Sequence, residues 1–67
     1  MELLIIKIGD HYLRVKPQGF FKVGLDKASV FPMKNLAQVK TLANEAETKG
    51  FKNIVIKKLV LTEEDLP

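Results

Sequence analysis

The sequence has no cysteine and no tryptophan, and its 67 residues include a single histidine, His11. Without cysteine the chain can form neither a disulfide nor a thiolate zinc site, which are two common ways of stabilising a small domain. One histidine leaves few ligands for any other metal, so we expect no cofactor. The fold must therefore depend on apolar residues, which make up 46% of the chain, an ordinary fraction for a globular domain.

Long hydrophobic runs are also missing. The most apolar segment covers residues 3–8 and contains Lys7, so it is too short for a membrane helix or for the core of a signal peptide. We therefore expect a cytoplasmic protein with no membrane segment. A chain of this length forms one small domain that buries roughly 60% of its unfolded surface. We place that domain at residues 1–61, followed by an acidic C-terminal tail at residues 62–67.

The charge is unevenly distributed along the chain. Its net value is +3, but Glu63, Glu64 and Asp65 supply three of the eight acidic residues. Residues 1–62 therefore hold eleven basic residues against five acidic ones, a net charge of +6. A basic body with an acidic end is typical of proteins with an anionic partner, and also of proteins whose charge serves only solubility.

A first hairpin is predicted at Gly9-Asp10, because this pair separates two β-rich runs and suits a two-residue turn. That turn pairs Ile8 with His11. Side chains alternate between the faces of a strand, so Ile6 and Ile8 join the core face. The opposite face receives Leu3, Ile5, Lys7, Tyr12, Arg14 and Lys16.

A second hairpin is predicted at KPQGF, residues 16–20. Pro17 and Gly19 favour a three-residue loop with a glycine bulge. A two-residue loop would bury Lys22, so the pattern favours the longer loop. In that register Phe21, Val23 and Leu25 lie on the core face, and Phe20 and Lys22 lie on the opposite face.

Residues 34–50 are predicted to form the single helix, since apolar residues recur there at helical spacing. Asn35 is the expected N-cap, and Gly50 the expected residue just past the C-terminal end. Residues 53–61 form the last predicted strand. Its apolar residues change phase after Ile56, which predicts a bulge at Lys57-Lys58.

These elements predict an α+β fold, a two-layer β-β-β-α-β domain with one helix on one face of a mixed four-stranded sheet. Residues 26–32 are interpreted as a connector after the third strand. A helix that returns across the sheet makes the last strand parallel to the first, and a right-handed crossover places it beside the first, in the order 3-2-1-4. Pairing at the free edge of the third strand is the alternative. The second face, called here the helix-free face, has nothing to cover it.

The leading hypothesis for the helix-free face is a protein partner or a homodimer. Leu3, Ile5 and Val55 form an apolar patch of the kind that soluble monomers usually avoid. Tyr12 and Arg14 beside it are typical of protein interfaces. The candidate partner-binding residues are therefore Leu3, Ile5, Tyr12, Arg14 and Val55.

The alternative is single-stranded nucleic acid, which other sheets bind by stacking bases on aromatic rings and neutralising phosphates with basic residues. The candidate residues are Lys7, Tyr12, Arg14, Lys16, Phe20, Lys22 and Lys57. The Gly-Phe spacing of the RNA-recognition motif is absent. A solvated face without a specific partner is a third interpretation, because lysine stems cover apolar surface well.

Catalytic signatures are absent from the sequence. Asp10-His11 is the one adjacent pair of an acid and an imidazole, and neighbouring strand residues point to opposite faces. Ser29 has no base near it in a recognisable motif. The four glycines are scattered and form no phosphate-binding loop. We therefore predict a non-enzymatic binding module.

One arrangement of residues resembles a known group of proteins. It comprises residues 12–15 (YLRV), residues 26–28 (DKA), Phe31, and a helix ending at Gly50-Phe51 before KNIVIKK. This arrangement is similar to small uncharacterised proteins encoded by phages and prophages of Gram-positive bacteria, over most of the chain. The resemblance implies an accessory role inside a bacterial cell, through binding of a host protein or of nucleic acid. It assigns no functional residues.

Overall fold

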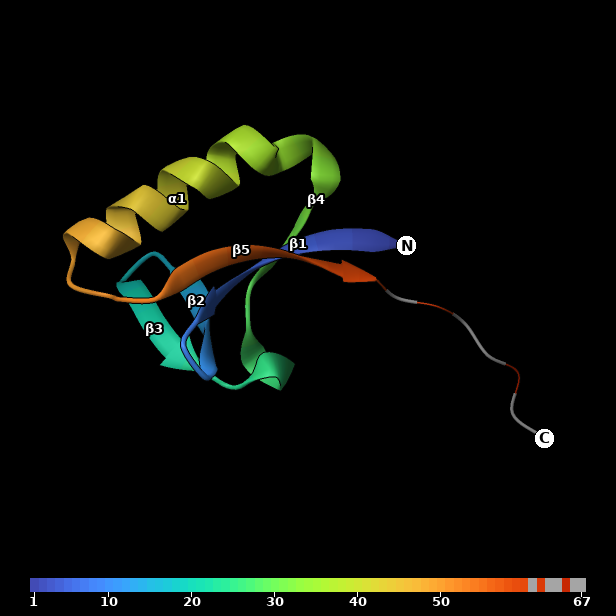
Figure 1. Cartoon of the computed structure of the whole chain (residues 1–67), viewed down its shortest axis with the longest axis horizontal. Coiled ribbons are helices and arrows are strands. Elements are labelled where there is room, and N and C mark those ends of the chain that lie inside the picture. Colours follow the sequence, from blue (N-terminus) through green and yellow to red (C-terminus); the bar gives the residue numbers. More distant parts are fainter. Residues whose placement is uncertain (61, 63–64, 66–67) are drawn as a thin grey trace.

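The computed structural model describes residues 1–60, 62 and 65. A single sheet carries one α-helix on one of its faces (Figure 1). The elements in chain order are β1 (Glu2–Ile8), β2 (His11–Lys16), β3 (Gly19–Val23), the 3₁₀ turn η1 (Leu25–Lys27), β4 (Val30–Pro32), the 3₁₀ turn η2 (Met33–Asn35), α1 (Leu36–Thr48) and β5 (Ile54–Val60). The predicted α+β class, with a single helix on one face, is confirmed. The predicted acidic tail lies mostly outside the described residues.

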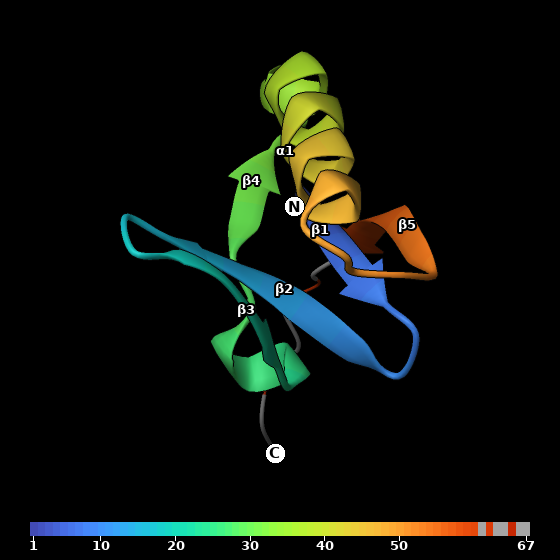
Figure 2. The same cartoon turned by 90° about the vertical axis from the view of Figure 1, so that its left-hand side faces the viewer.

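β1 is the central strand, because both of its edges are paired. β5 pairs with it along its whole length, from Glu2 opposite Val60 to Ile8 opposite Ile54. The other edge is shared by two strands, with β2 opposite residues 7–8 and β4 opposite residues 3–5. Figure 2 shows β4 and β5 on opposite sides of β1. A strand paired on both edges is mostly buried, which explains the nearly continuous apolar sequence of β1.

The last strand lies beside the first, as predicted, but the predicted mixed four-stranded sheet is wrong. Every described strand pair is antiparallel, and the sheet has five strands. β2, with β3 beyond it, and β4 pair with one edge of β1, and β5 pairs with the other edge. The cause is β4, whose sequence has the pattern of a connector. β4 runs antiparallel to β1 and carries the chain to the other end of the sheet before α1 begins. α1 then runs back in the same direction as β1. β5 therefore starts at the far end of β1 and runs antiparallel to it.

The first hairpin has the predicted two-residue turn, with Ile8 opposite His11 and Gly9 at a φ of 56°. The second hairpin differs from the prediction. Lys16 pairs with Gly19, so its loop is the two residues Pro17 and Gln18.

This shorter loop reverses the faces predicted for β3. Phe20 packs against the core, while Phe21 lies on the helix-free face and is 43% exposed. Lys22 comes to the core side but stays exposed. Since β3 is an edge strand, a lysine stem can extend past the rim of the core into solvent, so its position costs little. Leu25, also predicted in the core, is exposed in η1.

α1 confirms the predicted helix and its C-terminal end. Gly50 has a φ of 101°, its N–H donates to the carbonyl of Glu47 at 3.0 Å, and the N–H of Phe51 donates to the carbonyl of Ala46 at 3.1 Å. These two bonds form a Schellman motif, and Phe51 packs back on the core. Asn35 occupies the N-cap position, as predicted, but its side chain makes no capping hydrogen bond.

The core lies between α1 and the sheet. Its most deeply buried side chains are Ile6 and Leu13 from the sheet and Val39 and Ala46 from the helix. Fully burying one such aliphatic side chain stabilises a fold by roughly 1.5–3 kcal/mol. These residues recur every second position in the strands and at helical spacing in α1, as the sequence pattern predicts.

β5 pairs with β1 without interruption, so the predicted bulge at Lys57-Lys58 is wrong. The phase change has another origin, because β5 carries apolar residues on both faces. Leu59 lies opposite Leu3 on the helix-free face. Lys58 is on the helix side, where its Nζ lies 3.1 Å from the carboxylate of Glu2. Leu61, the other out-of-phase residue, lies outside the described residues.

Candidate binding surface on the helix-free face

The helix-free face contains most of the residues predicted to be there. Residues directly opposite each other in neighbouring strands share a face, and Lys7 lies opposite both Tyr12 and Val55. The same criterion places Phe21 with Arg14 and Lys57 with Ile5. Of the predicted candidates, Leu3, Ile5, Lys7, Tyr12, Arg14, Lys16, Val55 and Lys57 are on this face. The exceptions are Phe20 and Lys22, which the shorter hairpin loop places on the helix side.

The predicted exposed apolar patch is wrong at its centre. Ile5 is only 2% exposed, and Leu3 is partly buried. Two valines on the same face remain open, Val30 at 46% and Val55 at 49% exposure. Val30 lies opposite Ile5 in β4, and Val55 lies two residues from Lys57 in β5. The apolar surface is therefore divided by a buried residue.

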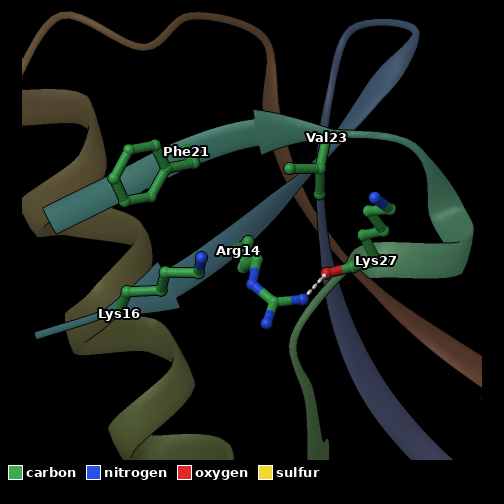
Figure 3. Close-up of a pocket in the computed structure, with 5 residues that line it drawn as sticks. All are labelled: Arg14, Lys16, Phe21, Val23 and Lys27. Carbon is green, nitrogen blue, oxygen red and sulfur yellow. Dashed lines mark hydrogen bonds between the residues drawn. The ribbon is translucent and has the colours of Figure 1, made fainter. Parts of the chain in front are cut away.

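A hollow of about 380 Å³ lies on this face over the β2–β3 hairpin. We call it the cationic hollow, because its lining contains three basic side chains. It is lined by Arg14 and Lys16 from β2, Phe21 and Val23 from β3, and Lys27 from η1 (Figure 3). β2 and β3 supply alternate residues, all on the face away from α1, and η1 closes one end.

η1 is held against β2 by hydrogen bonds. The Nη1 atom of Arg14 donates to the carbonyl oxygen of Lys27 at 2.9 Å. Two residues further on, the N–H of Ser29 donates to the carbonyl of Leu13 at 3.1 Å, and the Oγ of Ser29 accepts from the N–H of Val15 at 2.8 Å. Ser29 thus bonds to the part of β2, beyond Tyr12, that is not paired with β1. These bonds fix the wall of the cationic hollow and orient the Arg14 guanidinium.

Each aromatic ring on this face has a lysine over it. The Nζ of Lys16 lies 5.6 Å from the ring centroid of Phe21, and the Nζ of Lys7 lies 5.9 Å from that of Tyr12. Both distances are within the range of cation–π attraction, which is weak at exposed sites. The rings and cations are therefore already close together and can be separated at low cost.

The cations of this face have no acidic partner among the described residues. Across residues 1–60, 62 and 65, the ion pair within 4.0 Å joins Lys58 to Glu2, on the helix side. With the acidic residues that the structure describes, no such pair is formed by Lys7, Arg14, Lys16, Lys27 or Lys57. The positive charge of the face is thus not neutralised internally within that part of the chain, which favours an anionic ligand.

The described residues give no support to a metal site, since they contain no group of three or more His, Cys, Asp or Glu side chains arranged to hold an ion. His11 is exposed at the start of β2. No helix in this part of the chain is long and apolar enough to cross a membrane.

Three residues of the cationic hollow were not among the predicted candidates. Phe21 and Val23 were expected on the core face because the hairpin loop was predicted one residue too long. Lys27 was in the segment interpreted as a connector, and no periodic pattern in the sequence places it beside Arg14. A two-residue loop at Pro17-Gln18 would have identified Phe21, but the position of Lys27 depends on the tertiary contacts of η1.

Neither a protein-family model, nor a curated protein, nor a solved structure matches this chain. Function is therefore inferred from its own residues.

Proposed function

We propose that this protein is a non-enzymatic module that binds single-stranded nucleic acid on the helix-free face. The observation that carries the proposal is the set of cations there, which surround two accessible rings and have no carboxylate within 4.0 Å in the described part of the chain. The cations are Lys7, Arg14, Lys16, Lys27 and Lys57. Proteins that bind single strands combine these two features, with basic residues for phosphates and rings for bases.

A single strand fits this face better than a duplex does. The bases of a duplex are stacked on each other and cannot reach a ring on a sheet, whereas unstacked bases can. The aromatic residues Tyr12 and Phe21 lie on neighbouring strands, among the lysines rather than apart from them.

The setting we propose is the cytoplasm of a bacterial cell. The similarity to small proteins of phages and prophages supports this, since such proteins often act by binding nucleic acid or a host protein. The net charge of +3 also favours association with nucleic acid.

The test is a fluorescence anisotropy titration of a labelled mixed-sequence single-stranded oligonucleotide. The double variant Arg14→Gln, Lys16→Gln removes two cations of the helix-free face. The matched control, Lys34→Gln with Lys40→Gln, removes two exposed cations from η2 and α1. We expect the first variant to bind roughly tenfold more weakly in 50 mM salt, because two phosphate contacts are lost. The control should lose much less.

Equal losses in both variants would show that only net charge matters and would contradict a site on this face. Tighter binding of the matching duplex would contradict the choice of a single strand. Affinity must also fall steeply with salt, since counterion release accompanies each phosphate contact.

A protein partner or a second copy of the chain is the second candidate, supported by the exposure of Val30 and Val55 on the same face. Tyr12 and Arg14, with the partly buried Leu3, would then form the rest of the interface. Val55→Lys leaves the core intact, whereas the buried Ile5 is unsuitable for such a test. If the protein self-associates here, light scattering after size exclusion should show an oligomer that Val55→Lys converts to a monomer. A monomer in both proteins would remove self-association.

A further inference from the structure

We infer that the cationic hollow holds one nucleotide of the bound strand, with its phosphate at Arg14 and its base on the ring of Phe21. The inference rests on the proposed function and specifies where on the helix-free face one nucleotide lies. It follows from the orientation of Arg14, the accessibility of Phe21 and the size of the hollow.

The guanidinium of Arg14 is already oriented for an anion. One of its five N–H donors is used by the carbonyl of Lys27, through Nη1 at 2.9 Å. This bond holds the side chain between β2 and η1, and Arg14 lines the hollow with Lys16 on one side and Lys27 on the other (Figure 3). A planar guanidinium held in this way can bind a phosphate through two oxygens without first losing much conformational freedom.

Phe21 is the ring best placed for the base. It is 43% exposed at the edge of the hollow, and β3 holds it directly opposite Arg14. Lys16 now lies over this ring, 5.6 Å from its centroid. Stacking of a base on an aromatic ring contributes more than an exposed cation–π contact does. A base therefore displaces Lys16, whose ammonium is free to reach the same nucleotide's phosphate beside Arg14.

The volume of the hollow fits one nucleotide and no more. At about 380 Å³ it lies near the lower end of the range for small-molecule sites. The neighbouring nucleotides must lie outside it, toward the Lys7–Tyr12 pair and Lys57 on the rest of the face. This predicts two distinct aromatic positions, one inside the hollow and one beyond it.

Phe21→Leu and Tyr12→Leu form the matched pair that tests this. Both remove one ring from the helix-free face and keep an apolar side chain, but only Phe21 lines the hollow. The ligands are an octamer of deoxythymidine, thymidine 5′-monophosphate and inorganic phosphate, each titrated into ¹⁵N-labelled protein and followed by NMR. Unchanged amide dispersion in each variant verifies that it is folded.

We expect the monophosphate to shift the signals of Phe21, Lys27 and the Arg14 Nε–H, with inorganic phosphate shifting the Arg14 signal alone. Phe21→Leu should weaken the monophosphate at least fivefold and the octamer roughly tenfold, by loss of one stacked base. Tyr12→Leu should weaken only the octamer.

The outcomes separate the inference from the proposed function. If the octamer binds but both variants affect the monophosphate equally, or its shifts lie outside the hollow, the inference is wrong and the proposed function stands. If the octamer does not bind, the proposed function is wrong and the inference falls with it. If the octamer binds no more tightly than the monophosphate, the hollow takes a free nucleotide, which supports the site and overturns binding of a strand.

Discussion

The two faces of the sheet are built from alternating residues of the same strands, but their chemistry differs. Toward α1, Ile6 and Leu13 are each 1% exposed and make the core with Val39. On the helix-free face the neighbouring positions include Lys7 and Arg14, which point away from that core. The residues that stabilise the core and the residues proposed to bind a ligand are therefore separate, one position apart on the same strands.

Ile5 is the exception to this division, because it is a buried residue on the helix-free face. It lies on the helix-free face, opposite Val30 in β4 and Lys57 in β5, and yet it is only 2% exposed. η1 lies on this side of the sheet, opposite α1 (Figure 1). The helix-free face thus has a small buried centre in the middle of β1, surrounded by the charged positions.

The largest loss of stability should come from truncating a buried side chain between α1 and the sheet. Ile6→Ala removes most of a buried side chain from the centre of the core and leaves a cavity, so we expect the free energy of unfolding to fall by about 3 kcal/mol. Val55→Ala makes a similar chemical change at a half-exposed position of the other face, and should cost about 0.5 kcal/mol or less. Urea denaturation followed by circular dichroism measures both values.

If the two variants lose similar stability, the helix-free face is structural rather than available for a ligand, and the comparison fails. A small domain has little stability to lose, so Ile6→Val serves as a milder second variant. Its expected cost is about 1 kcal/mol.

The features that the sequence predicted correctly are determined by residues close together in the chain. The Gly9-Asp10 turn, the stripe of α1 and the Gly50 end of the helix each depend on a few neighbouring residues and their backbone preferences. The Gly9-Asp10 turn also sets the register of the first hairpin, and so predicts the correct face for Lys7, Tyr12 and Arg14.

The features that the sequence did not predict depend on distant contacts. β4 has only three residues and ends in a proline, so its pairing with β1 has no pattern of its own, although it sets the direction of β5. In β3, consecutive phenylalanines allow either face to be the core, and packing of Phe20 beside the end of α1 decides between them. The cationic hollow includes Phe21 and Lys27, so both errors concealed it.

A smaller effect should come from the end of the helix that covers the core. Gly50 has a φ of 101°, and beyond its two chain neighbours no atom lies within 4 Å of the position that a Cβ atom would take. The cost of Gly50→Ala is therefore conformational rather than steric, about 1–2 kcal/mol for a left-handed residue with a side chain. Thermal denaturation should show a lower midpoint than in the control Lys52→Ala, which changes an exposed position two residues away.

Well below that midpoint, the oligonucleotide affinity of Gly50→Ala should stay unchanged, because the Schellman motif belongs to the helix side. A loss of affinity in the folded variant would show that the two faces are coupled, and the separation of stability from binding would have to be abandoned.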